Sequence, residues 1–321
     1  MAKKKPRGGM AGRQHNLSAI LSPEEMEKFT AARRDQTPFL ATGNRDRLTD
    51  YFSIGEFERL LNQTGIWTPD RLEVLFDTRK VPAPNFFNQL AIFNGVRYRL
   101  EPEKLQQILG KGASLVLNDI DGLTEGLKTL KGVLADISGA RVESNLYYSQ
   151  PGHQAFSVHF DVHDVFAFQV EGRKRWRVYQ QAHRFPINHL AFLSGDTAAH
   201  EKAKGSVSME FVLEPGDLIY LPAGYYHQAI CTDSVSVHLS FSAIEMRGLD
   251  VISELFDKAV LEEFFRTPVD RAGGGALPAE DYVKLLAGNI EQLLTRRQFI
   301  EAIKQNQRSF PHPTGKISIP K

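Results

Sequence analysis

The sequence predicts a mainly β fold, a barrel or two-sheet roll, with helical segments before and after it. Between residues 145 and 245, short apolar or alternating runs are separated by Gly, Pro and Asp turns, which is typical of such folds. Outside this stretch, apolar residues recur at helical spacing. The composition of 42% hydrophobic and 24% charged residues over 321 positions is typical of a soluble globular protein.

The region before the barrel is predicted as a tail followed by an α/β segment. Residues 1–20 are basic and without periodicity, which predicts a disordered tail, either a solvated leader or an electrostatic handle on RNA or a ribosomal surface. Residues 21–144 are predicted to pack on the barrel. Their helices are expected to begin after the cap residue Ser22, at Ser53, at Glu101 and near Leu123, with a buried strand at 113–117.

The barrel core is predicted to span residues 145–245 and to contain eight strands. They are expected at 145–149, 155–161, 164–170, 174–180, 207–213, 217–221, 226–231 and 234–243. The stretch 183–205 interrupts them and is interpreted as an insertion on the substrate side. Residues 246–321 are predicted helical, at 249–265, 279–294 and 297–305. This last region is interpreted as a dimerisation element or a reduced winged helix, or as helices that pack back on the barrel.

A candidate metal site lies in the predicted strand 155–161. His159 and Asp161 are two residues apart, so on a strand both side chains point to the same face. His227 follows a turn-like Pro-Ala-Gly break and begins the next strand, which makes it the best third ligand. Two histidines and one carboxylate are typical of non-haem Fe(II) oxygenases, because coordination positions stay open. Five other histidines are interpreted as surface or loop residues: His153, His163, His183, His189 and His200. Of these, His163 with Asp164 is the one rival pair.

A lysine is predicted to point into the apolar interior. By strand alternation, Lys174 shares a face with Trp176 and Val178, whereas Arg173, Arg175 and Arg177 share the opposite, wet face. A buried ammonium is unfavourable without a partner, so Lys174 should meet an anion. The anion is either a buried Asp or Glu or the distal carboxylate of a dicarboxylate on the metal, and periodicity leaves both open.

The last predicted strand alternates strictly. Val235, Val237, Leu239 and Phe241 lie on one side of it, and Ser236, His238, Ser240 and Ser242 on the other. The polar side either borders the metal cavity or faces solvent. His238 is therefore a reserve candidate for the metal site, and whether Ser240 contributes to the site stays open.

Taken together, these segments resemble a Jumonji-C (JmjC) protein of the cupin superfamily, most closely the ribosomal oxygenase group and its bacterial relatives. The resemblance covers about residues 22–245. The segments that carry it are Asn145-Leu-Tyr-Tyr-Ser-Gln-Pro-Gly, Phe156-Ser-Val-His159-Phe-Asp161, Asp164 to Tyr179, Gly216 to Ala229 and, upstream, Ala113 to Leu123.

The resemblance implies a double-stranded β-helix, the cupin or JmjC jelly roll, with N-terminal helices and a C-terminal helical segment. It also implies an Fe(II)- and 2-oxoglutarate-dependent dioxygenase that uses O2 to hydroxylate its substrate. His159, Asp161 and His227 would be the iron ligands and the catalytic centre. Lys174 would bind the distal carboxylate of 2-oxoglutarate, and Asn145 would assist its binding.

The expected substrate is a protein side chain, an Arg or His of a ribosomal protein. Two alternatives stay open: the same chemistry on a peptide natural product or small metabolite, and a non-catalytic cupin-fold binding module. A homodimer is one option for the helical region. The net charge of +1 disfavours direct nucleic-acid binding beyond the basic tail. No apolar run is long enough for a membrane span, and the single cysteine, Cys231, suits the cytoplasm.

Overall fold

The structure, a computed structural model, describes residues 20–181, 183–193, 197–232, 235–275 and 277–312. The chain divides into two compact units. The first contains residues 1–137 and 142–243, and the second contains residues 138–141 and 244–321. The predicted basic tail lies outside the described residues except for Ile20, which is buried.

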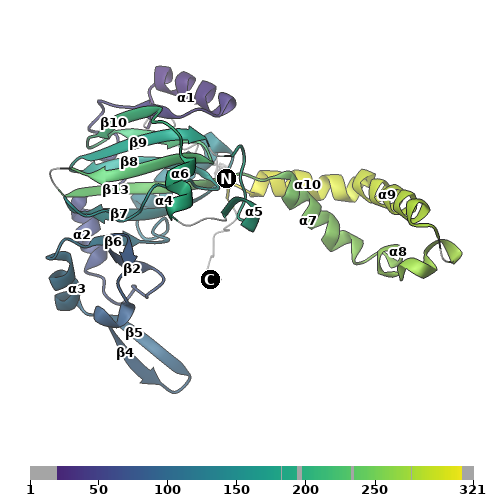
Figure 1. Cartoon of the computed structure of the whole chain (residues 1–321), viewed down its shortest axis with the longest axis horizontal. Helices are drawn as coiled ribbons and strands as arrows, with labels where there is room; N and C mark the ends of the chain where they lie inside the picture. Colours follow the sequence, from purple (N-terminus) through teal and green to yellow (C-terminus); the bar gives the residue numbers. More distant parts are fainter. Residues whose placement is uncertain (1–19, 182, 194–196, 233–234, 276, 313–321) are drawn as a thin grey trace, which may run out of the picture. The chain divides into compact units, whose positions relative to one another are not determined.

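The first unit is built on two sheets that enclose a common apolar core (Figure 1). The larger sheet has the strand order β1-β11-β8-β13-β7-β6-β2-β3. Its strands are β1 (Phe39–Ala41), β2 (Leu72–Phe76), β3 (Arg79–Lys80), β6 (Ser114–Leu117), β7 (Arg141–Ser149), β8 (Asp164–Glu171), β11 (Leu218–Leu221) and β13 (Ser236–Ile244). The smaller sheet has the order β10-β9-β12, with β9 (Lys174–Gln181), β10 (Met209–Leu213) and β12 (Tyr225–Cys231). This is the double-stranded β-helix that the sequence predicts.

The core between the two sheets follows from strand alternation. Val165 and Ala167 of β8 meet Trp176 and Val178 of β9, and all four are buried. Lys174 lies on the same face of β9 and is only 4% exposed, so the predicted inward direction of this lysine is confirmed. Glu210 of β10 pairs with the outward arginines of β9, which keeps their charges at the surface.

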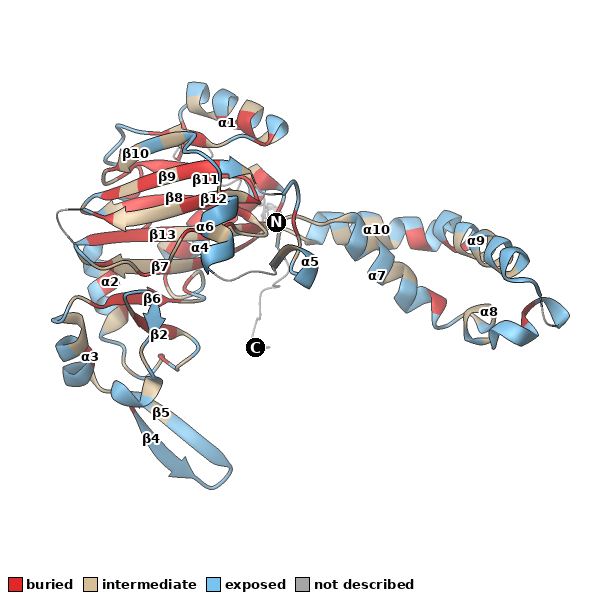
Figure 2. Ribbon diagram, in the orientation of Figure 1, coloured by how far each residue is buried: buried red, intermediate tan, exposed pale blue. Residues whose placement is uncertain are grey.

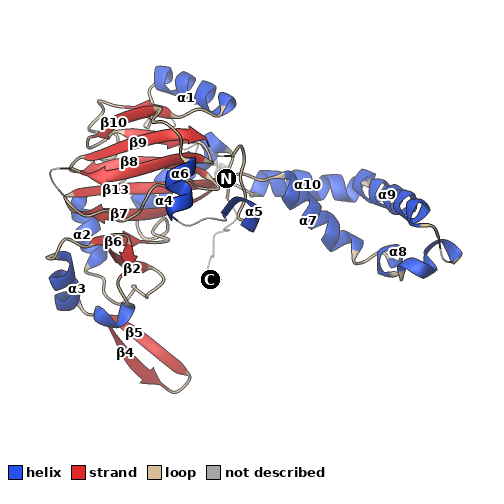
Figure 3. Ribbon diagram, in the orientation of Figure 1, coloured by secondary structure: helices blue, strands red, loops and turns tan. Residues whose placement is uncertain are grey.

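Helices flank the barrel where capping signals predict them (Figure 3). Ser22 caps the first helix and forms a reciprocal capping box with Glu25, and Ser53 caps the second. The helices of this unit are α1 (Pro23–Asp35), α2 (Ile54–Leu61), α3 (Pro102–Leu109), α4 (Glu125–Ser138), α5 (Leu190–Leu193) and α6 (Thr197–Ala203). The last two belong to the predicted insertion.

One predicted strand is wrong. Residues 155–161 do not form a strand, and the segment contains a single β-bridge, between His159 and His227. The apolar residues that suggested a strand, such as Val158 and Phe160, are buried instead in a small cluster with Tyr179 and Tyr226. Apolar residues in this segment are thus buried without regular pairing to a neighbouring strand.

A separate hairpin consists of β4 (Phe87–Ile92) and β5 (Gly95–Leu100), which pair only with each other. A short 3-10 turn over Ala83–Asn85 precedes it. Figure 2 shows both strands exposed over nearly their whole length.

The second unit is helical. It contains α7 (Gly248–Ala259), α8 (Glu263–Arg266), a 3-10 segment (Val269–Gly274), α9 (Ala279–Thr295) and α10 (Arg297–Ser309). The predicted helix 249–265 is interrupted after Ala259, so it forms two helices. Residues 248–275 and 277–312 contain helices and turns without a strand that could serve as a wing. In the described ranges, no helix combines the length and the apolar character required to cross a membrane.

Candidate functional site

The candidate metal site begins with a short backbone pairing. His159 and His227 exchange two hydrogen bonds, from each amide nitrogen to the other carbonyl oxygen, at 3.2 and 2.8 Å. Two residues further along, the amide of Gly224 donates to the carbonyl oxygen of Asp161 at 2.8 Å. The irregular segment with His159 and Asp161 is thereby fixed against the start of β12.

The turn before β12 requires glycine. Gly224 has a φ of +85°, and a Cβ atom there would lie 1.9 Å from the carbonyl oxygen of His183. A side chain at this position would therefore displace the segment that fixes Asp161 and His227.

These contacts bring the three predicted ligands together. Suitable ligand atoms of His159, Asp161 and His227 all lie within 4.8 Å of one another, and this is the one such His/Cys/Asp/Glu group among the described residues. His227 Nε2 lies 3.5 Å from Asp161 Oδ2. His227 is buried, whereas the other two side chains are half-buried, so the set borders an accessible space.

Backbone carbonyls fix which nitrogen of each histidine faces the site. His159 Nδ1 lies 2.8 Å from the carbonyl oxygen of Ser157, and His227 Nδ1 lies 3.0 Å from that of Tyr225. A carbonyl only accepts, so each Nδ1 carries the proton and each Nε2 presents a lone pair. This is the arrangement that metal-binding histidines normally have.

The protonation states of His227 and Asp161 also favour the binding of a metal cation. Burial and the neighbouring His159 lower the pKa of His227 to about 4, so its imidazole is neutral at neutral pH. Burial raises the pKa of the Asp161 carboxyl, but His159, His227 and His163 together outweigh burial, and the net pKa lies below its ordinary value. The neutral imidazole of His227 and the ionised carboxylate of Asp161 are thus available as ligands.

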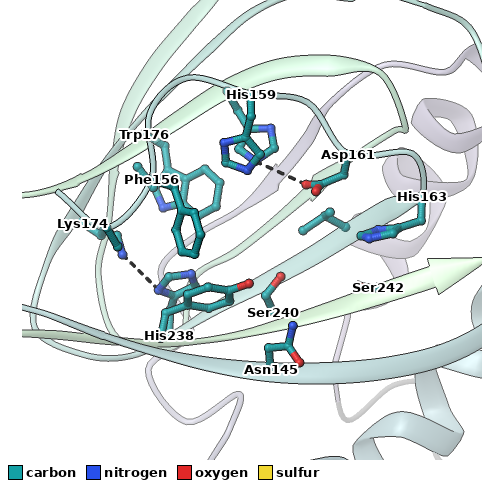
Figure 4. A pocket seen from close by; sticks show the side chains of 15 residues that line it. Asn145, Phe156, His159, Asp161, His163, Lys174, Trp176, His238, Ser240 and Ser242 are labelled. Atoms are coloured by element: carbon teal, nitrogen blue, oxygen red, sulfur yellow. Dashed lines mark hydrogen bonds and ion pairs between the residues drawn. The ribbon is translucent and has the colours of Figure 1, made fainter. Parts of the chain in front are cut away.

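A cavity of about 310 Å³ adjoins this set. Figure 4 shows His159, Asp161, Lys174 and His238 directed into the same space. The residues that line it are Asn145, Tyr147, Ala155, Phe156, His159, Asp161, His163, Val165, Lys174, Trp176, His227, Ala229, His238, Ser240 and Ser242.

Lys174 reaches this cavity without an anionic partner. Its Nζ donates to Ser149 Oγ at 3.0 Å and lies 3.4 Å from His238 Nδ1. No carboxylate among the described residues pairs with it, so the predicted alternative of a structural Asp or Glu partner is not present there. Burial lowers the pKa of Lys174 to about 8. The indole Nε1 of Trp176, also on the cavity wall, is buried and has no acceptor among the described residues. The pocket therefore has a cation and a donor available for an anionic ligand.

A row of stacked rings connects the lysine with the ligand set. His238 stacks on Tyr147 with ring centroids 4.8 Å apart, and Trp176 meets His238 edge-on at 5.8 Å. Trp176 in turn stacks on His227 at 5.8 Å. Burial and the Lys174 ammonium hold the pKa of His238 well below its ordinary value, so this ring is neutral. His238 accordingly lies beside Lys174 and outside the three-residue metal group.

Strand alternation along β7 places further side chains at the cavity, and the sequence analysis used this alternation only in part. Asn145, Tyr147 and Ser149 are spaced by two on β7, and all three face the site. Asn145 alone was predicted there; alternation along β7 would have added the other two. Burial raises the pKa of Tyr147 to about 12, so its hydroxyl stays protonated.

Polar residues of two further segments border the cavity. The polar face of β13 borders the cavity through His238, Ser240 and Ser242, which decides between the two orientations left open for that strand. His163, in the bend before β8, lines the cavity too, and this position agrees with its interpretation as a surface or loop residue.

The fold and site together define a cupin-type double-stranded β-helix with a two-histidine, one-carboxylate group facing its interior. Residues 124–250 match the family model described as the JmjC domain. This part of the chain is thus similar to a JmjC domain.

Curated proteins similar to this chain include ribosomal oxygenase 1 and the demethylase and histidyl-hydroxylase NO66. Human ribosomal oxygenase 1 is 31% identical over 210 residues, which are 62% of this chain and 32% of that protein. The bifunctional lysine-specific demethylase and histidyl-hydroxylase NO66 of Drosophila persimilis is 27% identical over 310 residues, 93% of this chain and 42% of that protein. The chain thus spans about a third to two fifths of the length of these curated relatives.

A solved structure has the same fold. The ribosomal oxygenase YcfD of Escherichia coli in complex with cobalt and 2-oxoglutarate superposes with a TM-score of 0.56 and 17% identity, over 88% of this chain and 70% of that chain.

Proposed function

We propose that this chain is an Fe(II)- and 2-oxoglutarate-dependent oxygenase that hydroxylates a histidine side chain of a ribosomal protein. The observation that carries the proposal is a single cavity that joins a three-residue metal-ligand group to a buried lysine without an anionic partner. A metal cation on the three ligands, together with a dicarboxylate that extends across the cavity to Lys174, would satisfy both the ligand group and the lysine.

His159, Asp161 and His227 would hold the iron. Both Nε2 lone pairs are oriented by backbone carbonyls, so the protein holds the ligands in position before a cation arrives. Three protein ligands leave coordination positions open. Bound ferrous iron, with 2-oxoglutarate and dioxygen, would supply the oxidising chemistry that converts a C–H bond into C–OH, while the cosubstrate becomes succinate and CO2.

Lys174 would bind the distal carboxylate of 2-oxoglutarate. The hydrogen bond from Nζ to Ser149 Oγ and the contact with His238 hold the ammonium at the cavity wall. A carboxylate next to Lys174 would favour its protonated form and reverse the effect of burial on its pKa. Asn145 would assist cosubstrate binding through its amide on the same wall.

The charges around the cavity favour a neutral substrate side chain. Among its described lining residues, Asp161 is the one carboxylate, and the metal would occupy it. A guanidinium would thus enter a site with Lys174 and no free anion, whereas an imidazole could hydrogen-bond to neutral groups such as Ser240 or Asn145. This favours histidine over arginine, and the histidyl-hydroxylase activity in the name of NO66 agrees.

The first experiment measures cosubstrate turnover. Iron-loaded protein should convert 2-oxoglutarate into succinate, and His159→Ala and Lys174→Ala should each remove most of this turnover. His189→Ala, at an exposed histidine, is the matched control and should leave it unchanged. If both site variants turned over like the wild type, the assignment would be wrong.

The second experiment identifies the substrate. Intact masses of ribosomal proteins are compared between cells with and without this protein, and a gain of one oxygen atom on one protein is expected. Peptides of that segment with His or Arg at the modified position then separate the two side chains. An unchanged set of masses would favour a peptide natural product or small metabolite as substrate. A protein that takes up no iron, cobalt or manganese would instead favour the non-catalytic binding module.

We also propose that the helical unit pairs two chains and that the protein acts in the cytoplasm. Leu249, Ile252, Phe256 and Val260 follow a spacing of three or four along α7 and its end, and each is 42–67% exposed. Such a stripe is typical of an interface. Light scattering of the wild type should give the mass of a dimer, whereas Ile252→Ser/Phe256→Ser should give a monomer.

A further inference from the structure

The β4–β5 hairpin of the first unit is exposed over most of its length. From Asn88 to Arg99 every residue except Tyr98 is exposed, and Phe93, at the turn, is 102% exposed. Leu90, Ile92 and Val96 are each about half exposed. A two-stranded ribbon with both faces in water is marginally stable. Large apolar side chains concentrated on such a ribbon indicate a binding element.

The base of the hairpin is nevertheless firmly anchored. Phe86, Phe87 and Leu100 are 1–3% exposed, and the rings of Phe86 and Phe87 are in contact at 5.1 Å. Lys104 of α3 donates to the side chain of Asn88 at 2.8 Å. The hairpin thus has a buried, well-packed base and a solvent-exposed outer part, as expected of an element that contacts a partner.

The charge of this region has one sign. Residues 78–100 contain Arg79, Lys80, Arg97 and Arg99 and no acidic residue, although the whole chain carries a net charge of only +1. Lys80 pairs with Glu73. The three arginines have no ion-pair partner within the described part of the chain. The net charge therefore conceals a local excess of free cations.

The register places the arginines on one face. Arg97 lies opposite Leu90 and Arg99 opposite Asn88. Residues two apart on a strand project to the same side, so the two guanidinium groups follow one another about 6.7 Å apart at their bases. Guanidinium groups bind phosphate in a bidentate manner.

We propose that this hairpin binds single-stranded nucleic acid, with phosphates on Arg97 and Arg99 and a base stacked on Phe93. The charge complementarity and the open aromatic ring are the two components of such sites: cations along the backbone and an aromatic platform for a base. An acidic protein surface would engage the arginines, but it has no flat ring for Phe93. The site is separate from the cavity of the proposed oxygenase. It differs from the expectation, drawn from net charge, that disfavours direct nucleic-acid binding beyond the N-terminal tail.

The test uses the full chain and a fluorescein-labelled oligouridine of about twelve nucleotides, with anisotropy measured from 50 to 200 mM salt. Each phosphate contact contributes about 0.7 to the slope of log affinity against log salt on a single strand, so two arginines contribute about 1.4. Over this fourfold range of salt, the wild type should lose about sevenfold more affinity than Arg97→Ala/Arg99→Ala. Phe93→Ala should weaken binding without changing the slope. The matching deoxyuridine oligonucleotide shows whether the ribose hydroxyl matters.

Two controls isolate the hairpin. Lys202→Ala/Arg308→Ala removes the same charge from exposed cations elsewhere and should behave like the wild type, as should Arg97→Lys/Arg99→Lys in its salt slope. The basic N-terminal tail is identical in all variants. Succinate formation should be unaffected by every hairpin substitution, so this proposal and that of the oxygenase fail independently.

Three outcomes would overturn the proposal. The first is absence of saturable binding at 50 mM salt, or equal slopes for the wild type and Arg97→Ala/Arg99→Ala. The second is binding of polyglutamate as tight as that of the oligonucleotide, which would assign the hairpin to an acidic protein. The third is loss of self-association in Phe93→Ala with unchanged oligonucleotide binding, which would assign it to a second copy of this chain.

Discussion

Lys174→Met should stabilise the barrel and at the same time impair cosubstrate binding. Burial lowers the pKa of this lysine from 10.5 to about 8. At 1.36 kcal/mol per pH unit, the difference of about 2.5 amounts to roughly 3 kcal/mol of unfavourable free energy for the charged side chain in the folded state. Methionine removes this penalty and nearly preserves the volume. It also removes the contacts with Ser149 and His238, at about 1 kcal/mol each. The net expectation is a gain of about 1 kcal/mol.

The pH dependence of this gain follows from the direction of the pKa change. The folded state binds the proton of Lys174 less tightly than the unfolded chain does, so the penalty is complete below pH 8 and fades between about pH 8 and 10.5. The melting temperature of Lys174→Met should exceed that of the wild type by about 2–4 °C at pH 7. The difference should shrink and then reverse as the pH rises beyond 10.

Lys174→Met should weaken the binding of 2-oxoglutarate although it stabilises the fold. An unpaired carboxylate left in the pocket costs about 2–5 kcal/mol, so the KM for 2-oxoglutarate should rise by on the order of thirtyfold or more. Calorimetric melting and succinate formation measure the two effects, and Lys202→Met, at an exposed lysine, is the control. A variant that melted several degrees lower with an unchanged KM would refute the reasoning and assign Lys174 a purely structural role.

The other predictions concern the metal group, the turn and the support of the barrel. His227→Ala should lower Co(II) affinity by at least about 100-fold in a titration followed by cobalt absorbance, and unchanged affinity would exclude this residue as a ligand. Gly224→Ala should cost at least about 1–3 kcal/mol in thermal unfolding, because its φ is +85° and the added Cβ would meet the carbonyl of His183; a wild-type melting curve would contradict this. Arg47→Met should destabilise the protein by about 3–5 kcal/mol in urea, because the buried guanidinium pairs with Glu25 and bonds to two carbonyl oxygens; a loss below 1 kcal/mol would show the pair to be dispensable.

Much of the fold follows from local patterns in the sequence. The caps at Ser22 and Ser53 determine where two helices begin, because side-chain oxygens satisfy amides that the first turn leaves free. Period-two alternation determines that Lys174 and Trp176 face inward, because a strand has only two faces. The turn before His227 is likewise local, since Gly224 must adopt a positive φ.

Other features depend on partners distant in the chain. The segment 155–161 has the composition of a strand, but only His159 finds a pairing partner, so one bridge forms in place of a ladder. The helix predicted at 249–265 is interrupted after Ala259, which its apolar spacing does not reveal. Tyr147 lines the cavity although its pattern in the sequence did not single it out.

The sequence by itself determined the ligand types and the direction of the lysine, since both depend on spacing along a strand or turn. Only the tertiary structure decided that Lys174 has no carboxylate partner among the residues that the structure describes, and that the polar face of β13 borders the cavity. The tertiary structure also decided that most of the β4–β5 hairpin is exposed to solvent. The physical reason is that burial and ion pairing are properties of the surroundings of a residue. Those surroundings come from strands that a local pattern does not bring together.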